Sequence, residues 1–200
     1  MAALLPNKQL SITDTYQVLV DGQSCDNLIS RQAILQTACR DSVCVQFDEI
    51  KGLKKTDLRS IFTGKQVVYV YHNQIDARGD KAITEDEVFD ACEEAITEIM
   101  DLIRKISTNA NTYKFIVTSD HGFIYKREKI TESEKISGIN GTNACVNRRF
   151  IISDNQILED GIGNMSLGYV LGSNDQRVVS YPVSSNVFKT PGAGQNYVHG

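Results

Sequence analysis

Two short segments of the chain pair residue types that bind metal ions. Asp76 and Asp80 stand four residues apart in the run YHNQIDARGD, and Asp120 and His121 are neighbours in the run TSDHG. Carboxylate oxygen and imidazole nitrogen are the ligands that zinc, manganese and related divalent ions take. If the two segments meet in the fold, their carboxylates repel one another unless a cation lies between them. The residue types therefore favour a divalent metal site.

The histidines are few and lie close to these segments. The chain has three, and they are His72, His121 and His199. His199 stands in a glycine-containing terminal segment, which can approach a metal without steric conflict. His72 follows a predicted strand directly, and a single histidine there is more often packed or hydrogen-bonded in a core. We therefore expect His72 at most to support the ligands from outside.

Simpler interpretations of both pairs stay open. Asp76 and Asp80 could cap a turn, because aspartate readily hydrogen bonds its own backbone in loops. Asp120 and His121 could form a helix cap or a salt-bridged pair. Only the conjunction of both pairs at one edge of a sheet favours a metal over these interpretations.

The elements around the two segments predict why they would meet. Residues 67–71 (VVYVY) form an apolar run typical of a strand buried on both faces in a parallel sheet. Thr84 and Glu87 make a capping box, and apolar residues then recur every three or four positions, which predicts a helix over residues 84–107. Residues 115–118 (FIVT) are predicted to be a second buried strand. A strand, a helix and a second strand in this order form a crossover connection, which makes the two strands parallel. Both segments should then lie at the C-terminal edge of one sheet, within ~5 to 10 Å of each other.

The remaining elements complete an α/β prediction. The fold class is a mostly parallel sheet with helices on both faces, followed by a more irregular, β-rich C-terminal region. Residues 126–135 (KREKITESEK) carry mixed charges and are interpreted as a solvated face. The other predicted elements are strands at 16–20, 43–47, 149–152 and 177–181 and helices at 28–39 and 56–62.

Composition limits the class of protein. The chain has 200 residues, of which 41% are hydrophobic and 23% charged, which is typical of a single globular domain over residues 1–200. A net charge of -4 gives no basic field for non-specific binding of nucleic acid or anionic membranes. The five cysteines lack the spacing of a zinc knuckle, and no secretion signal or membrane span appears. The sequence therefore predicts a cytoplasmic protein without a membrane partner.

Residues 67–80 (VVYVYHNQIDARGD) and 116–125 (IVTSDHGFIY) resemble the PglZ proteins of bacterial phage-resistance (BREX) systems. The core domain of those proteins belongs to the alkaline-phosphatase superfamily. The opening MAALLP and the turn at residues 20–22 are also similar, so the resemblance extends over nearly the whole chain. It implies part of an alkaline-phosphatase-like fold, a phosphoester substrate and other phage-defence proteins as partners, with nucleic acid only as a substrate.

The resemblance also implies a ligand set. It assigns Asp76, Asp80 and His199 to one divalent ion and Asp120 and His121 to a second. The expected ions are Zn²⁺ or Mn²⁺, and Asp80, which stands where many relatives have histidine, makes its site harder and also compatible with Mg²⁺. Two ions ~4 Å apart would activate a nucleophile and neutralise the attacking and leaving oxygens of an in-line displacement.

The catalytic nucleophile is not assigned to a residue of this chain. In the family it is a serine or threonine expected ahead of these motifs, together with an early aspartate ligand, so both are expected upstream. The leading hypothesis is a metal-dependent phosphatase or phosphodiesterase domain that is inactive as this chain alone. The alternative is a non-catalytic interaction module of a phage-defence complex. Nucleic-acid binding as the main activity is disfavoured by the acidic charge.

Overall fold

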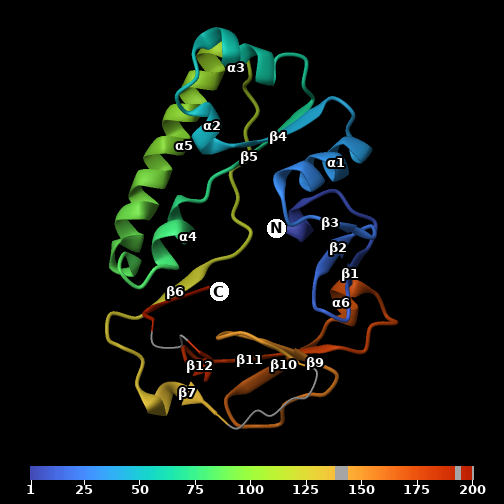
Figure 1. Cartoon of the computed structure of the whole chain (residues 1–200), viewed down its shortest axis with the longest axis vertical. Coiled ribbons are helices and arrows are strands. Elements are labelled where there is room, and N and C mark those ends of the chain that lie inside the picture. Colours follow the sequence, from blue (N-terminus) through green and yellow to red (C-terminus); the bar gives the residue numbers. More distant parts are fainter. Residues whose placement is uncertain (138–143, 192–194, 200) are drawn as a thin grey trace. The chain divides into compact units, whose positions relative to one another are not determined.

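The computed structural model describes residues 1–137, 144–191 and 195–199, which divide into two units (Figure 1). The first unit comprises residues 1–11, 17–78 and 87–120, and the second comprises residues 12–16, 79–86 and 121–200. The first contains η1 (Ala2–Leu4), β2 (Val18–Val20), β3 (Gln23–Ser24), α1 (Leu28–Ala38), β4 (Ser42–Gln46), α2 (Phe47–Ile50), α3 (Lys55–Phe62), β5 (Val67–Tyr71) and α5 (Val88–Ala110). The second contains β6 (Phe123–Tyr125), η3 (Glu132–Glu134), β7 (Lys135–Ile136), β8 (Cys145–Val146), β9 (Ile151–Ser153), β10 (Ile162–Ser166), α6 (Gly168–Leu171), β11 (Val178–Pro182), β12 (Val187–Phe188) and β13 (Tyr197–His199). Three elements contain residues of both units, and they are β1 (Leu10–Ile12), α4 (Gln74–Gly79) and η2 (Glu85–Glu87).

The centre of the first unit is the parallel pair of strands β4 and β5. Their register places Val43 opposite Val68 and Val45 opposite Val70. Because side chains alternate along a strand, these valines share one face of the pair. They pack with an apolar cluster that includes Leu58 of α3 and further residues of α2 and α5. The apolar face of the strand pair thus holds these three helices.

Helix α1 lies on the other side of the strand pair from α3 and α5 (Figure 1). Its first turn is capped by the side chain of Asn27. The side chain of Gln32 accepts a hydrogen bond from the Cys44 amide at 3.2 Å, and that of Gln36 donates one to the Ser42 carbonyl at 3.1 Å. These two bonds satisfy backbone groups of β4. The first unit therefore has parallel strands with helices on both sides.

The 23-residue helix α5 differs from its prediction at both ends. It begins at Val88 rather than at residue 84, because the 3-10 turn η2 precedes it. Its N-cap is Glu87, which makes no side-chain capping hydrogen bond. It continues to Ala110 and stops at Asn111, whose φ of 53° is the left-handed conformation that asparagine tolerates at a helix end. The apolar repeat is confirmed, and the predicted start is not.

Residues 115–118 do not form the strand that their apolar sequence predicts. They pair with no strand of the described chain, although Phe115 packs against the core of the first unit. Ile116 is 94% exposed and Val117 is 63% exposed. An apolar run supplies suitable side chains for a strand, but a ladder also needs a neighbouring backbone. The predicted crossover is therefore absent from the described residues, and a shared sheet edge is not what brings the site residues together.

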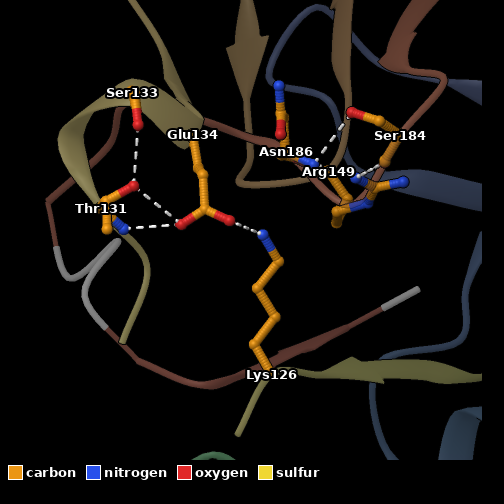
Figure 2. Close-up of polar contacts among 7 residues, drawn as sticks. All are labelled: Lys126, Thr131, Ser133, Glu134, Arg149, Ser184 and Asn186. Carbon is orange, nitrogen blue, oxygen red and sulfur yellow. Dashed lines mark hydrogen bonds and ion pairs between the residues drawn. The ribbon is translucent and has the colours of Figure 1, made fainter. Parts of the chain in front are cut away.

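Short, mostly antiparallel strands build the second unit. Four of them form a sheet in the order β10, β11, β9, β8, while β6 pairs with β13 and β7 with β12. The buried Ser180 hydroxyl donates to Asn164 Oδ1 at 2.6 Å within the sheet. Arg149 donates to the carbonyls of Ser184 and Asn186 at 2.7 and 2.5 Å (Figure 2), which fixes the turn before β12. Burial lowers the pKa of the Arg149 guanidinium.

The predicted mostly parallel sheet is not confirmed. Among the described strands, β4 and β5 pair in parallel, as do β7 and β12, whereas β6 and β13 and the four-stranded sheet are antiparallel. The chain is a mixed α/β structure with several small sheets. A single domain over residues 1–200 remains a prediction. None of the helices in the described residues combines the length and apolar character needed to cross a membrane.

Candidate metal centre

Two histidines meet in the second unit because β6 and β13 pair in antiparallel register. His199 lies opposite Phe123, two positions after His121. The ring centroids of the two histidines are 4.7 Å apart, and a ring nitrogen of each lies within 4.8 Å of one of the other. The sequence predicts both histidines as ligands, and the strand pair that joins them was not predicted.

A carboxylate completes this group of side chains. Oδ1 of Asp80 lies 2.7 Å from Nε2 of His199. The side chains are 49% and 37% exposed, respectively, so an ion or a substrate can reach them from solvent. The Gln195 side chain donates to the backbone carbonyl of Asp80 at 3.3 Å and ties the same two segments together. We refer to Asp80, His121 and His199 as the Asp–His–His cluster.

The tautomer of His121 follows from its neighbour. Its Nδ1 lies 3.0 Å from the carbonyl oxygen of Gly122. A carbonyl oxygen can only accept, so in the neutral imidazole this contact places the proton on Nδ1 and the lone pair on Nε2. An imidazole fixed in this way presents Nε2 as its ligand atom, which is the arrangement common in metal sites.

The donors of the cluster suit a divalent ion, and the separation of Asp80 from His199 is compatible with binding to the same ion. One carboxylate and two imidazoles are a donor set that zinc and manganese accept. Two atoms bound to one zinc ion lie at most about 4.2 Å apart, twice a typical bond length of ~2.1 Å. The separation of 2.7 Å between Asp80 and His199 is within that limit, and the bound of 4.8 Å for the histidine nitrogens is close to it.

The two other predicted ligands belong to the first unit. Asp76 lies in the short helix α4, which the sequence does not predict, and in the same helix Arg78 forms an ion pair with Glu94. The carboxylate of Asp120 lies 3.6 Å from the backbone nitrogen of Met1. The assignment of Asp76 and Asp120 to metal ions therefore stays a prediction.

His72 has close partners within the first unit. Its Nε2 lies 2.9 Å from a carboxylate oxygen of Glu98, and its ring centroid is 4.6 Å from that of Phe47. Its side chain is 12% exposed. These contacts are those of a packed and hydrogen-bonded histidine, and a supporting role for it beside a metal remains a prediction.

Sequence reasoning missed the residues that hold the cluster in place. Tyr197 is fully buried, and its amide donates to Oε2 of Glu85 at 3.0 Å across 112 positions of sequence. Its ring lies against Gly79, where an added Cβ would be 2.5 Å from a ring carbon. No local pattern predicts contacts over such a separation. The glycine beside Asp80 was the available signal, because glycine permits close approach of another group.

The charged stretch that follows β6 is mostly paired with itself. Lys126 donates to Glu134 at 2.5 Å, and Thr131 donates to the same carboxylate through its amide at 2.8 Å (Figure 2). The lysine and the threonine together lower the pKa of Glu134 to about 2. These side chains line an open polar hollow of about 660 Å³ together with the exposed Arg127 and Lys129. The pairing agrees with the interpretation of this stretch as a solvated face.

Comparison with known proteins identifies relatives over the whole chain. The model of a family described as BREX system PglZ alkaline phosphatase-like domain matches residues 1–200. The chain is 36% identical over 200 residues to the alkaline phosphatase-like protein PglZ of Bacillus cereus (strain H3081.97). It is 32% identical over 204 residues to the alkaline phosphatase-like protein BrxZ of Escherichia coli O9:H4 (strain HS). Each comparison covers 100% of this chain and 23% of the relative, so the chain spans less than a quarter of their length. No solved structure matches it.

Proposed function

This chain belongs to the PglZ family of alkaline phosphatase-like domains of BREX systems, and we propose that it supplies the metal site of a phosphoester hydrolase in a phage-defence protein. The observation that carries the proposal is the Asp–His–His cluster of the second unit, with Asp80 at 2.7 Å from His199 and the two histidine rings 4.7 Å apart. The family name alone leaves the chemistry open, whereas one carboxylate and two imidazoles are donors of the kind that divalent ions take.

We assign the ligands as the family resemblance implies. Asp80 and His199, with Asp76, hold one ion, and His121 with Asp120 holds a second. Their positions in the chain support Asp76 and Asp120 as further ligands. Asp76 precedes Asp80 by about one helical turn, and Asp120 is bonded directly to His121. The two imidazoles suit Zn²⁺ or Mn²⁺, and the extra carboxylate of Asp80 makes its site compatible with Mg²⁺ as well.

In this proposal the protein side chains orient the metal ligands, and the ions supply positive charge to the phosphoester. Bound at this cluster, two divalent ions would neutralise phosphoryl oxygens and lower the pKa of an attacking hydroxyl. The contact between Oδ1 of Asp80 and Nε2 of His199 directs that imidazole towards the carboxylate that would share its ion, and the Gly122 carbonyl orients the ring of His121. A phosphoester would be held at the ions themselves, since the net charge of -4 offers no general basic field.

The nucleophile is proposed to come from outside this chain. The chain spans 23% of the length of its curated relatives, so the remainder of such a protein has room for it. We propose cytoplasmic action together with other phage-defence proteins, with a phosphate monoester or diester as substrate and nucleic acid only in that role.

The test is hydrolysis by a full-length family protein that carries this domain. Its turnover of p-nitrophenyl phosphate and bis-p-nitrophenyl phosphate is measured with added Mn²⁺ or Zn²⁺. Removing an outer partner of a metal ligand commonly costs 10–100-fold, so His199→Ala and His121→Ala should each lower kcat/KM by at least about 100-fold. Asp154→Asn, an exposed aspartate outside the cluster, is the matched control. Unchanged turnover in both histidine variants would sink the proposal, and loss of a partner complex without any turnover in the parent would favour the interaction module.

A further inference from the structure

The outer edge of β13 is held by two charged side chains. Asn196, the residue before Tyr197, faces β6, because its carbonyl accepts from the Lys126 amide at 3.1 Å. Backbone groups alternate between the two edges of a strand, so those of Tyr197 point the other way. The Tyr197 amide donates to Glu85 at 3.0 Å, and its carbonyl accepts from Arg148 Nη1 at 2.9 Å. A carboxylate and a guanidinium thus take the place of a neighbouring strand.

The ring of Tyr197 fixes the other side of the same segment. It packs on Gly79, leaving no room for a Cβ there. Its centroid lies 5.1 Å from that of Phe123 and 5.5 Å from that of His199. Gly79 directly precedes Asp80, and Glu85 lies five positions after Asp80. Asp80 is therefore bracketed by two contacts that both end on Tyr197, two residues before His199.

We propose that Glu85 is a positioning residue for the metal site, whose bond to the Tyr197 amide sets the separation of Asp80 and His199. The proposal rests on the proposed function, since it concerns the same ligands. A hydrogen bond from a buried amide to a carboxylate is stronger than one between neutral groups. Without it the buried Tyr197 loses a charge-assisted hydrogen bond, and β13 is no longer held to the segment that carries Asp80 and Glu85. His199 shifts with β13, whereas Asp80 stays on the segment of Glu85.

The direct test compares metal affinity in three variants of the full chain. Glu85→Ala removes the acceptor, Glu85→Gln keeps an acceptor oxygen without the charge, and Asp86→Ala removes a charge at the adjacent exposed position. The dissociation constant for Mn²⁺ is measured by calorimetry well below the unfolding temperature of each variant. Outer partners of metal ligands are worth 10–100-fold, so Glu85→Ala should weaken binding by about that factor while Glu85→Gln stays within about threefold of the parent. Asp86→Ala should bind as the parent does.

A second readout does not depend on metal. In the metal-free chain the imidazole nitrogen resonances of His199 should shift in Glu85→Ala and return towards their parent positions in Glu85→Gln, whereas a loss of general stability would not be restored in this selective way. Equal affinities and equal His199 resonances in the parent and Glu85→Ala would overturn the positioning role. Absence of Mn²⁺ binding by the parent chain would instead overturn the proposed function, and this inference with it.

Discussion

Single acids outside the Asp–His–His cluster carry charge effects that can be measured directly. Lys135 and Lys189 lower the pKa of Glu132 to about 2, and Lys126 with Thr131 does the same for Glu134. Both glutamates lie in the short helix η3, within the charged stretch of residues 126–135. Their ion pairs make this surface sensitive to acid.

We expect Glu134→Gln to flatten the acid dependence of stability. The folded-state pKa of about 2 is below the ~4.3 of an unfolded glutamate, so the contribution of this group is complete above about pH 4.3 and is lost as the pH falls towards 2. The melting temperature of the parent should therefore drop more steeply between these pH values than that of Glu134→Gln. Thermal unfolding monitored by circular dichroism checks this, with Glu128→Gln, an exposed acid in the same segment, as the control. Parallel curves for the parent and Glu134→Gln would contradict the expectation.

The ligand candidates of the site could be predicted from the sequence, but the residues that hold them in place could not. Asp80, His121 and His199 are predicted as ligands from chemistry and family resemblance, and the structure brings these three together. Glu85 and Tyr197 carry no ligand signature, because their contact joins distant segments and depends on the fold. Residue chemistry is local, whereas support of a ligand is a property of tertiary packing.

Elements with a strong local pattern match their predictions closely. Helices α1 (Leu28–Ala38) and α3 (Lys55–Phe62) and strand β5 (Val67–Tyr71) lie within one or two residues of the predicted ranges. Residues 115–118 have an equally strong apolar pattern and form no strand within the described chain, since pairing depends on another backbone. The pair β6 and β13 shows the reverse case, as three-residue strands are too short to give a clear pattern.

The packing of helix α3 predicts how a substitution in its buried face changes the stability of the protein. Leu58 is 0% exposed within the cluster shared by α2, α3, α5 and β4. Leu58→Ala should lower the free energy of unfolding by about 2–5 kcal/mol, the usual cost of a cavity at a buried leucine. Ile29→Ala in α1 removes a side chain that is 83% exposed and should change it by less than about 0.5 kcal/mol. Urea unfolding of both variants provides the measurement, and similar losses in the two would contradict the packing described for α3.

For the whole molecule, the family was predicted more accurately than the sheet. The motifs around Asp76 and Asp120 identify the PglZ family, and the family model confirms it over residues 1–200. The predicted mostly parallel sheet is not confirmed, because the strands of residues 121–200 pair mainly in antiparallel fashion. The glycine and β-branched composition of that region predicts short strands but not their partners.

The most direct measurement of the central claim is the metal content of the purified chain. After incubation with Mn²⁺ or Zn²⁺ and removal of unbound ions, elemental analysis should find at least one and at most two ions per parent chain, and the same for the control Asp154→Asn. The double variant His121→Ala/His199→Ala should retain a small fraction of that amount, because it lacks both imidazoles of the Asp–His–His cluster. Equal metal content in the parent and the double variant would contradict a metal site at this cluster.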